Sequence, residues 1–156
     1  TSEFLVDKNI IGLGNTAIKV KLLSEELIVS ENLIAVDWQI FSRVLLLNNT
    51  KAIFTNNTSV FYRQYDGNII GLDSLTYDKL KFMLNVKVEH YRELFKFNKK
   101  FRKYLHSYLE LEEYLKDDSS CKKYLSYLNK NKNKYPFWWE EIKPLKEIDY
   151  ENSIKP

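Results

Sequence analysis

Apolar side chains that recur every three or four residues run through the second half of the chain and constrain its fold most strongly. They are Leu80, Leu84, Val88, Tyr91, Phe95, Phe101, Leu105 and Tyr108. This spacing predicts one long amphipathic helix or two helices in succession. Asp117–Ser120 then indicates a break and a helix N-cap before a further helix over Lys122–Asn129. Residues 77–156 are therefore expected to form an α-helical C-terminal extension.

The first half of the chain has a different pattern and contains all four glycines. Asn9–Ala17 is typical of a short apolar strand interrupted by closely spaced glycines. Helical spacing of apolar residues predicts a helix over Val36–Leu47, which two asparagines end. Lys51–Phe54 and Ser59–Tyr62 predict two strands around a polar turn. The first half is therefore expected to contain β-structure.

Composition excludes several classes of protein. The 156 residues include 24 basic and 21 acidic side chains, and a net charge of +3 is too small to indicate nucleic-acid binding by itself. The single cysteine, Cys121, excludes a disulfide framework, a thiolate zinc site and an iron–sulfur cluster. His90 and His106 have no ligand triad nearby and are expected to be surface or core histidines. No apolar run approaches the roughly 18 residues that would span a membrane.

The stretch from Ile34 to Leu72 carries the most informative motifs. Asp37-Trp38 opens the predicted helix, and Tyr-Arg-Gln-Tyr at residues 62–65 follows, before Asn-x-x-Gly at residues 68–71. In order and spacing, these motifs resemble the acceptor-side half of family 2 glycosyltransferases, in the rhamnosyltransferase-like, polysaccharide-biosynthesis branch. The resemblance covers roughly residues 8–72.

The resemblance implies both a fold and an activity. The fold class would be α/β, with residues 1–76 forming the C-terminal, acceptor-side part of a GT-A-like mixed sheet with packed helices. The activity would be an inverting transfer of a sugar from a nucleotide-sugar donor to a polysaccharide or lipid-linked acceptor. The implied location is the cytoplasm or the inner face of the membrane.

The resemblance also assigns site residues. Asp37 would be the general base that accepts the proton of the acceptor hydroxyl, and Trp38 would present its ring to a sugar. Arg63 would make a two-pronged contact with phosphate oxygens. The other substrate-binding residues would be Gln64, Asn68 and Gly12.

Each of these residues also has a purely structural interpretation. Asp37 fits a helix cap or a partner of the helix dipole, and Trp38 fits the core. Arg63 fits a surface ion pair, and Gly12 fits a turn, since no phosphate-binding glycine motif follows it. Tyr65 stands where the family usually has histidine, which puts a metal-binding role of this loop in doubt.

One part of the family pattern is missing. The resemblance implies an Asp-x-Asp motif that holds Mg²⁺ or Mn²⁺ against the donor diphosphate, and the 156 residues contain no such motif. They also lack the alternating strands and helices that bind a nucleotide. We expect the metal ligands in an N-terminal half that precedes Thr1, and we expect this chain to be inactive alone.

The predicted long helix is strongly basic between Lys79 and Lys103, where nine Lys or Arg side chains accompany two Glu. This run fits a solvated helix face, or a segment attracted to an anionic membrane surface. Nucleic-acid binding is less favoured because the sequence shows no recognised nucleic-acid-binding pattern. An alternative to the enzyme is therefore a non-catalytic interaction module, which docks through this helix and the aromatic residues around Trp138-Trp139.

Overall fold

Helices account for nearly all the regular structure of this chain. The computed structural model describes residues 2–23, 29–48, 50–61, 75–133, 137 and 139–148. Within these residues, the α-helices are α1 (Val36–Ser42), α2 (Tyr77–Phe97), α3 (Arg102–Tyr114) and α4 (Asp118–Lys130). A π-helical turn over Arg43–Leu47 continues α1. Short 3₁₀ turns lie at Ser2–Val6, Leu13–Asn15, Val20–Leu22, Lys99–Phe101 and Leu145–Glu147.

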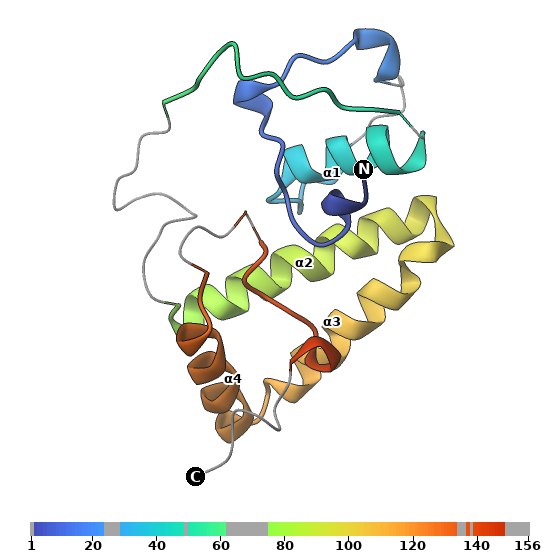
Figure 1. The fold of residues 1–156 in the computed structure, drawn as a ribbon. Coiled ribbons are helices and arrows are strands. Elements are labelled where there is room, and N and C mark those ends of the chain that lie inside the picture. Colours follow the sequence, from blue (N-terminus) through green and yellow to red (C-terminus); the bar gives the residue numbers. More distant parts are fainter. Residues whose placement is uncertain are drawn as a thin grey trace.

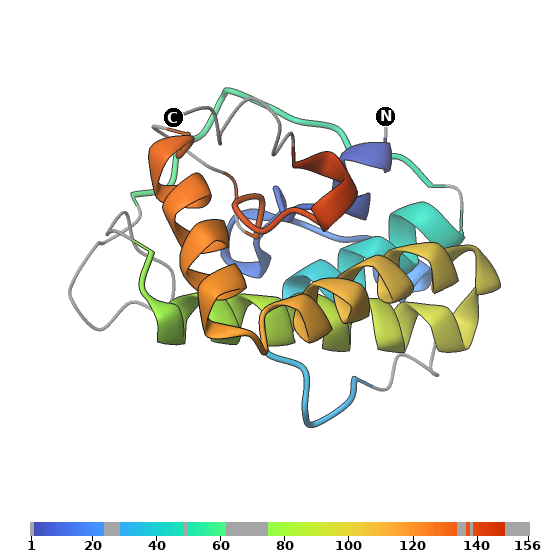
Figure 2. The same cartoon turned by 90° about the horizontal axis from the view of Figure 1, so that it is seen from below.

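The apolar stripe in the second half forms two helices, α2 and α3, which lie side by side (Figure 1 and Figure 2). The break falls at Asn98, whose extended backbone (φ −151°, ψ 119°) ends α2, and whose side chain accepts a hydrogen bond from the Lys100 N–H at 2.9 Å. Phe101, in the turn between the helices, is only 1% exposed. Burial of this ring anchors the turn, so the two helices fold back on each other.

The expected helix N-cap after the third helix is confirmed. The Asp117 carboxylate accepts a hydrogen bond from the Ser120 N–H at 2.7 Å and begins α4. At the other end of α4, the Asn129 side chain pairs with both backbone groups of Leu75, at 3.0 and 3.1 Å, just before α2 begins. This pair fixes the end of α4 beside the start of α2.

The first half of the chain packs on α2 through α1 and the N-terminal turn Ser2–Val6. Three successive carbonyls of this region accept hydrogen bonds from core side chains: Leu5 from Trp38, Val6 from Tyr91, and Asp7 from Lys87. The turn is therefore held between α1 and α2. Buried apolar residues from both halves of the chain form one cluster.

The predicted helix over Val36–Leu47 is confirmed, but the predicted α/β fold is wrong. The described residues form an all-α arrangement with no sheet, and their strand structure is limited to a β-bridge at Asn9. Strands were expected at 51–54 and 59–62; residues 51–61 form none and their side chains are exposed, and Tyr62 lies outside the described residues. Strands need a partner for their backbone hydrogen bonds, and the described part of the chain offers none there. The described residues therefore do not form the expected GT-A-like mixed sheet.

No helix of the described segments is both long enough and apolar enough to cross a bilayer.

Candidate functional site

Asp37 lies in the first turn of α1, as the sequence predicted, and its side chain is half-buried. Its carboxylate accepts a hydrogen bond from the Trp38 N–H at 2.7 Å. Burial raises the pKa of this carboxyl group, and the hydrogen bond from Trp38 and the nearby side-chain amide of Asn9 oppose this rise. A carboxylate with a raised pKa holds a proton more strongly, which suits a general base.

Trp38 belongs to the core in this structure. Its side chain is 0% exposed, and its Nε1 donates a hydrogen bond to the Leu5 carbonyl at 2.7 Å. The indole stacks on the His90 ring at a centroid distance of 3.6 Å and meets Tyr91 edge-on at 6.0 Å. The indole is thereby fixed in the core and presents no exposed ring surface.

Gly12 is buried and precedes the 3₁₀ turn Leu13–Asn15. Its N–H donates to the Asn15 side chain at 3.2 Å, and its φ of −95° is open to any residue. The contact is local to this turn. Three other predicted substrate-binding residues lie outside the described residues: Arg63, Gln64 and Asn68. Tyr65, which stands where the family usually has histidine, lies outside them as well.

A second group of polar side chains, which the sequence did not single out, surrounds Lys87 in α2. Lys87 is 1% exposed, and its ammonium donates to the Asp7 carbonyl at 2.7 Å and to the Tyr108 hydroxyl at 2.8 Å. Burial lowers the pKa of Lys87 to about 7, although the negative charges of Asp7, Glu147 and Glu140 oppose this. The amine therefore titrates near neutral pH.

His90 lies one helical turn from Lys87 and is fully buried. Neither of its ring nitrogens has a hydrogen-bond partner among the described residues. Burial, and then the positive charge of Lys87, hold the pKa of His90 well below its usual value, so the ring is neutral. Its stacking on Trp38 is the contact that places it.

The divalent metal implied by the resemblance has no fitting site in the described segments. Nowhere in them do three or more His, Cys, Asp or Glu side chains gather closely enough to hold a metal ion. The buried Lys87 and His90 also do not suit Mg²⁺, which prefers oxygen ligands.

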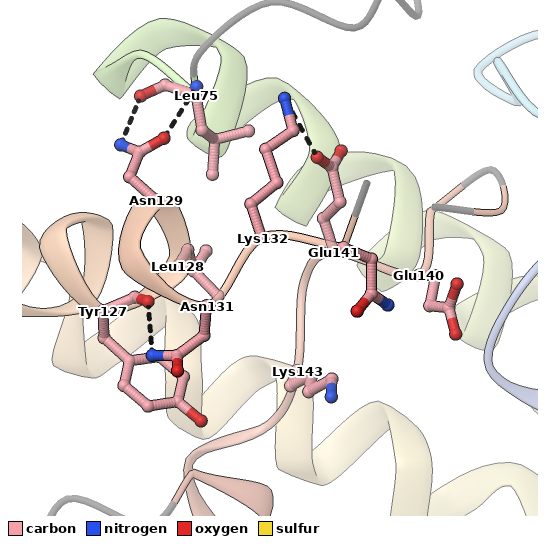
Figure 3. Close-up of a pocket in the computed structure, with 10 residues that line it drawn as sticks. Leu75, Tyr127, Leu128, Asn129, Asn131, Lys132, Glu140, Glu141 and Lys143 are labelled. Carbon is pink, nitrogen blue, oxygen red and sulfur yellow. Dashed lines mark hydrogen bonds and ion pairs between the residues drawn. The ribbon is translucent and has the colours of Figure 1, made fainter. Parts of the chain in front are cut away.

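A small polar pocket lies between the end of α4 and residues 140–143 (Figure 3). The pair formed by Asn129 and Leu75 closes one side of it. Its charged residues are largely compensated: Lys132 lies 3.8 Å from Glu141, and Glu140 pairs with Lys8 at 2.7 Å. The pocket offers hydrogen-bonding groups with little net charge.

The surface where α2 turns into α3 has the opposite character. Exposed basic side chains line an open depression there, with Glu110 as the only carboxylate among the lining residues. The cations are Lys99, Lys100, Arg102, Lys103 and Lys146, which we call the basic corner. Because like charges gather here, this surface favours an anionic partner.

Comparisons with known proteins give no further assignment for these sites. The chain matches no protein-family model, no curated protein and no solved structure.

Proposed function

We propose that this chain is part of an inverting glycosyltransferase that moves a sugar from a nucleotide-sugar donor to a polysaccharide or lipid-linked acceptor. The observation that carries the proposal is Asp37, a half-buried carboxylate with a raised pKa in the first turn of α1, at the position where the sequence resemblance requires the base.

In the proposed reaction, the acceptor hydroxyl oxygen attacks the anomeric carbon, and its proton passes to the Asp37 carboxylate. The bond between the anomeric carbon and the donor phosphate oxygen breaks, and its electron pair leaves with the nucleotide diphosphate. A carboxylate fixed at this point lowers the barrier by accepting the proton as the new bond forms. Trp38 acts as a positioning residue, because its hydrogen bond to Leu5 and its stacking on His90 fix the start of α1.

Arg63, Gln64 and Asn68 remain proposed donor-binding residues on the sequence resemblance alone. A guanidinium at position 63 would stabilise the negative charge that develops on the leaving diphosphate. Gly12 remains a proposed substrate contact through its backbone. We expect the chain to be inactive by itself, because the described residues provide neither a metal site nor a nucleotide-binding sheet.

The decisive experiment is Asp37→Asn in the polypeptide that the parent gene encodes, assayed for sugar transfer. Loss of a general base lowers kcat by roughly 10²–10⁴-fold, with little change in the KM for the donor. The matched control is Asp78→Asn, which removes a carboxylate from the first turn of α2 at an exposed position. Near-normal turnover of Asp37→Asn would remove the base assignment.

A non-catalytic interaction module is the second candidate function, and the basic corner is the observation that favours it. The two candidates differ in what precedes Thr1 in the parent gene. An upstream coding segment of about one hundred residues with an Asp-x-Asp motif supports the enzyme. An initiation codon directly before Thr1 supports the module.

A further inference from the structure

The nine basic residues between Lys79 and Lys103 do not share one environment. Lys87 is buried in the core. Arg92 and Lys96 form ion pairs with Glu89 and Glu93 on the same helix. The positive charge of this run is therefore partly buried and partly compensated along α2, before the chain reaches the basic corner.

The basic corner itself keeps its charge. None of the ion pairs formed among the described residues includes Lys99, Lys100, Arg102, Lys103 or Lys146. Glu110, the one carboxylate in the depression, lies 3.2 Å from the His106 Nδ1. Lys146 comes from the turn Leu145–Glu147, so the cluster combines two segments that are far apart in sequence. An anion placed here meets five cations and one acid.

The position of the corner limits the kind of partner that fits. The junction of α2 and α3 lies at an outer edge of the molecule in two perpendicular views (Figure 1 and Figure 2). Phe97, the last residue of α2, is 49% exposed beside it, with the Arg43 guanidinium 4.0 Å from its ring centroid. A surface at an outer edge that combines cations with an exposed aromatic ring suits a flat anionic headgroup layer.

We propose that the basic corner docks this protein on a membrane surface that contains anionic lipids. The inference is independent of the proposed transfer reaction, because its test contains no sugar donor and measures no turnover. Contact is electrostatic and peripheral, with Phe97 placed to enter the headgroup region as the cations approach the lipid phosphates.

Vesicle sedimentation of the full chain tests this proposal, with neutral phosphatidylcholine vesicles compared with vesicles containing one third phosphatidylglycerol. The variant combines Lys99→Gln, Arg102→Gln and Lys103→Gln, and it keeps Lys100, whose ammonium donates to the Leu46 carbonyl. One basic residue near such a surface changes partitioning by about five-fold, so the variant should bind anionic vesicles roughly 100-fold more weakly. Wild-type binding should weaken as salt is added.

The matched control combines Lys122→Gln, Lys123→Gln and Lys130→Gln, which removes three exposed charges from α4. It should bind anionic vesicles within a few-fold of wild type. Equal losses in the two variants, or equal wild-type binding to neutral and anionic vesicles, would overturn the proposal. So would binding of a single-stranded RNA oligomer with no binding to anionic vesicles. Far-ultraviolet circular dichroism should show wild-type helicity in both variants.

Discussion

Phe61 and Phe101 both lie in aromatic-rich stretches of the chain, yet Phe61 is 98% exposed and Phe101 is 1% exposed. Phe101 sits in the turn between two helices that satisfy their own backbone hydrogen bonds and need only to bury one apolar face. Phe61 lies in an extended segment, residues 50–61, which has no strand partner in the described part of the chain. Among the described residues, the helices thus bury their apolar faces on one another, whereas the side chains of residues 51–61 stay exposed.

The first half nevertheless contributes to the core at one place, the contact of α1 and the N-terminal turn with α2. Trp38 carries that contact through its hydrogen bond to Leu5 and its stacking on His90. The difference therefore lies within the first half: α1 packs on the helices of the second half, and the side chains of residues 51–61 stay exposed. Substitutions at the buried contact of Trp38 and in the exposed segment should therefore differ widely in their effect on the unfolding free energy.

Trp38→Ala should have the largest effect on stability. Removing a fully buried tryptophan costs about 3–5 kcal/mol of unfolding free energy, and here it also leaves the Leu5 carbonyl without its donor. Urea unfolding followed by circular dichroism measures the change. Trp38→Phe should lose less, because a phenylalanine ring can still stack on His90. A wild-type urea midpoint for Trp38→Ala would show that the two halves fold independently.

Lys87 sits where the two halves meet, since it donates to Asp7 in one and to Tyr108 in the other. Its pKa is about 7 in the folded chain, whereas the ordinary pKa of a lysine is 10.5. Between these values the unfolded chain binds more protons at Lys87, so stability should increase as pH rises. The expected slope between pH 7 and 8.5 is up to about 1.4 kcal/mol per pH unit.

The matched variant for that measurement is Lys87→Met, which keeps a long unbranched side chain without the amine. Its unfolding free energy should vary much less between pH 7 and 8.5. The pH range ends at 8.5 so that Cys121, Tyr91 and Tyr108 do not titrate within it. Burial raises the pKa of the Cys121 thiol and holds the pKa values of the Tyr91 and Tyr108 hydroxyls well above 10.0. An unchanged slope in Lys87→Met would assign the pH dependence to another group.

The helices of the second half could be predicted from the sequence because their signals are local. Residue types alone predict a helix N-cap within Asp117–Ser120, and the hydrogen bond that the Ser120 N–H donates to the Asp117 carboxylate confirms it. The step of six residues from Phe95 to Phe101 is out of phase with a single helix, and the break at Asn98 lies within it. The prediction of two strands in the first half is wrong for the opposite reason. A strand depends on a partner strand, which its own sequence does not specify.

For the candidate site, the position of Asp37 at the start of a helix could be predicted from the sequence, and its proposed role stays a prediction. The order Val36-Asp37-Trp38 located Asp37 at the start of α1, where its carboxylate is half-buried. The sequence does not single out Lys87, because it is one of nine basic residues between Lys79 and Lys103. It lies three residues after Leu84 and four before Tyr91, which is the phase of the buried face. At position 87, the helical phase therefore predicts burial of the side chain, whereas its charge predicts exposure.

The smallest effect is expected in the exposed segment, from Ile53→Ser and Phe61→Ser, whose native side chains are 94% and 98% exposed. These substitutions remove apolar surface that is already in water, so the unfolding free energy should change by less than about 0.5 kcal/mol. Phe101→Ser is the matched comparison and should be strongly destabilising, because it places a hydroxyl and a cavity at a buried ring position. A loss of more than about 1 kcal/mol for Phe61→Ser would mean that this ring is buried when the chain folds in solution. That result would remove the contrast between the extended segment and the helices.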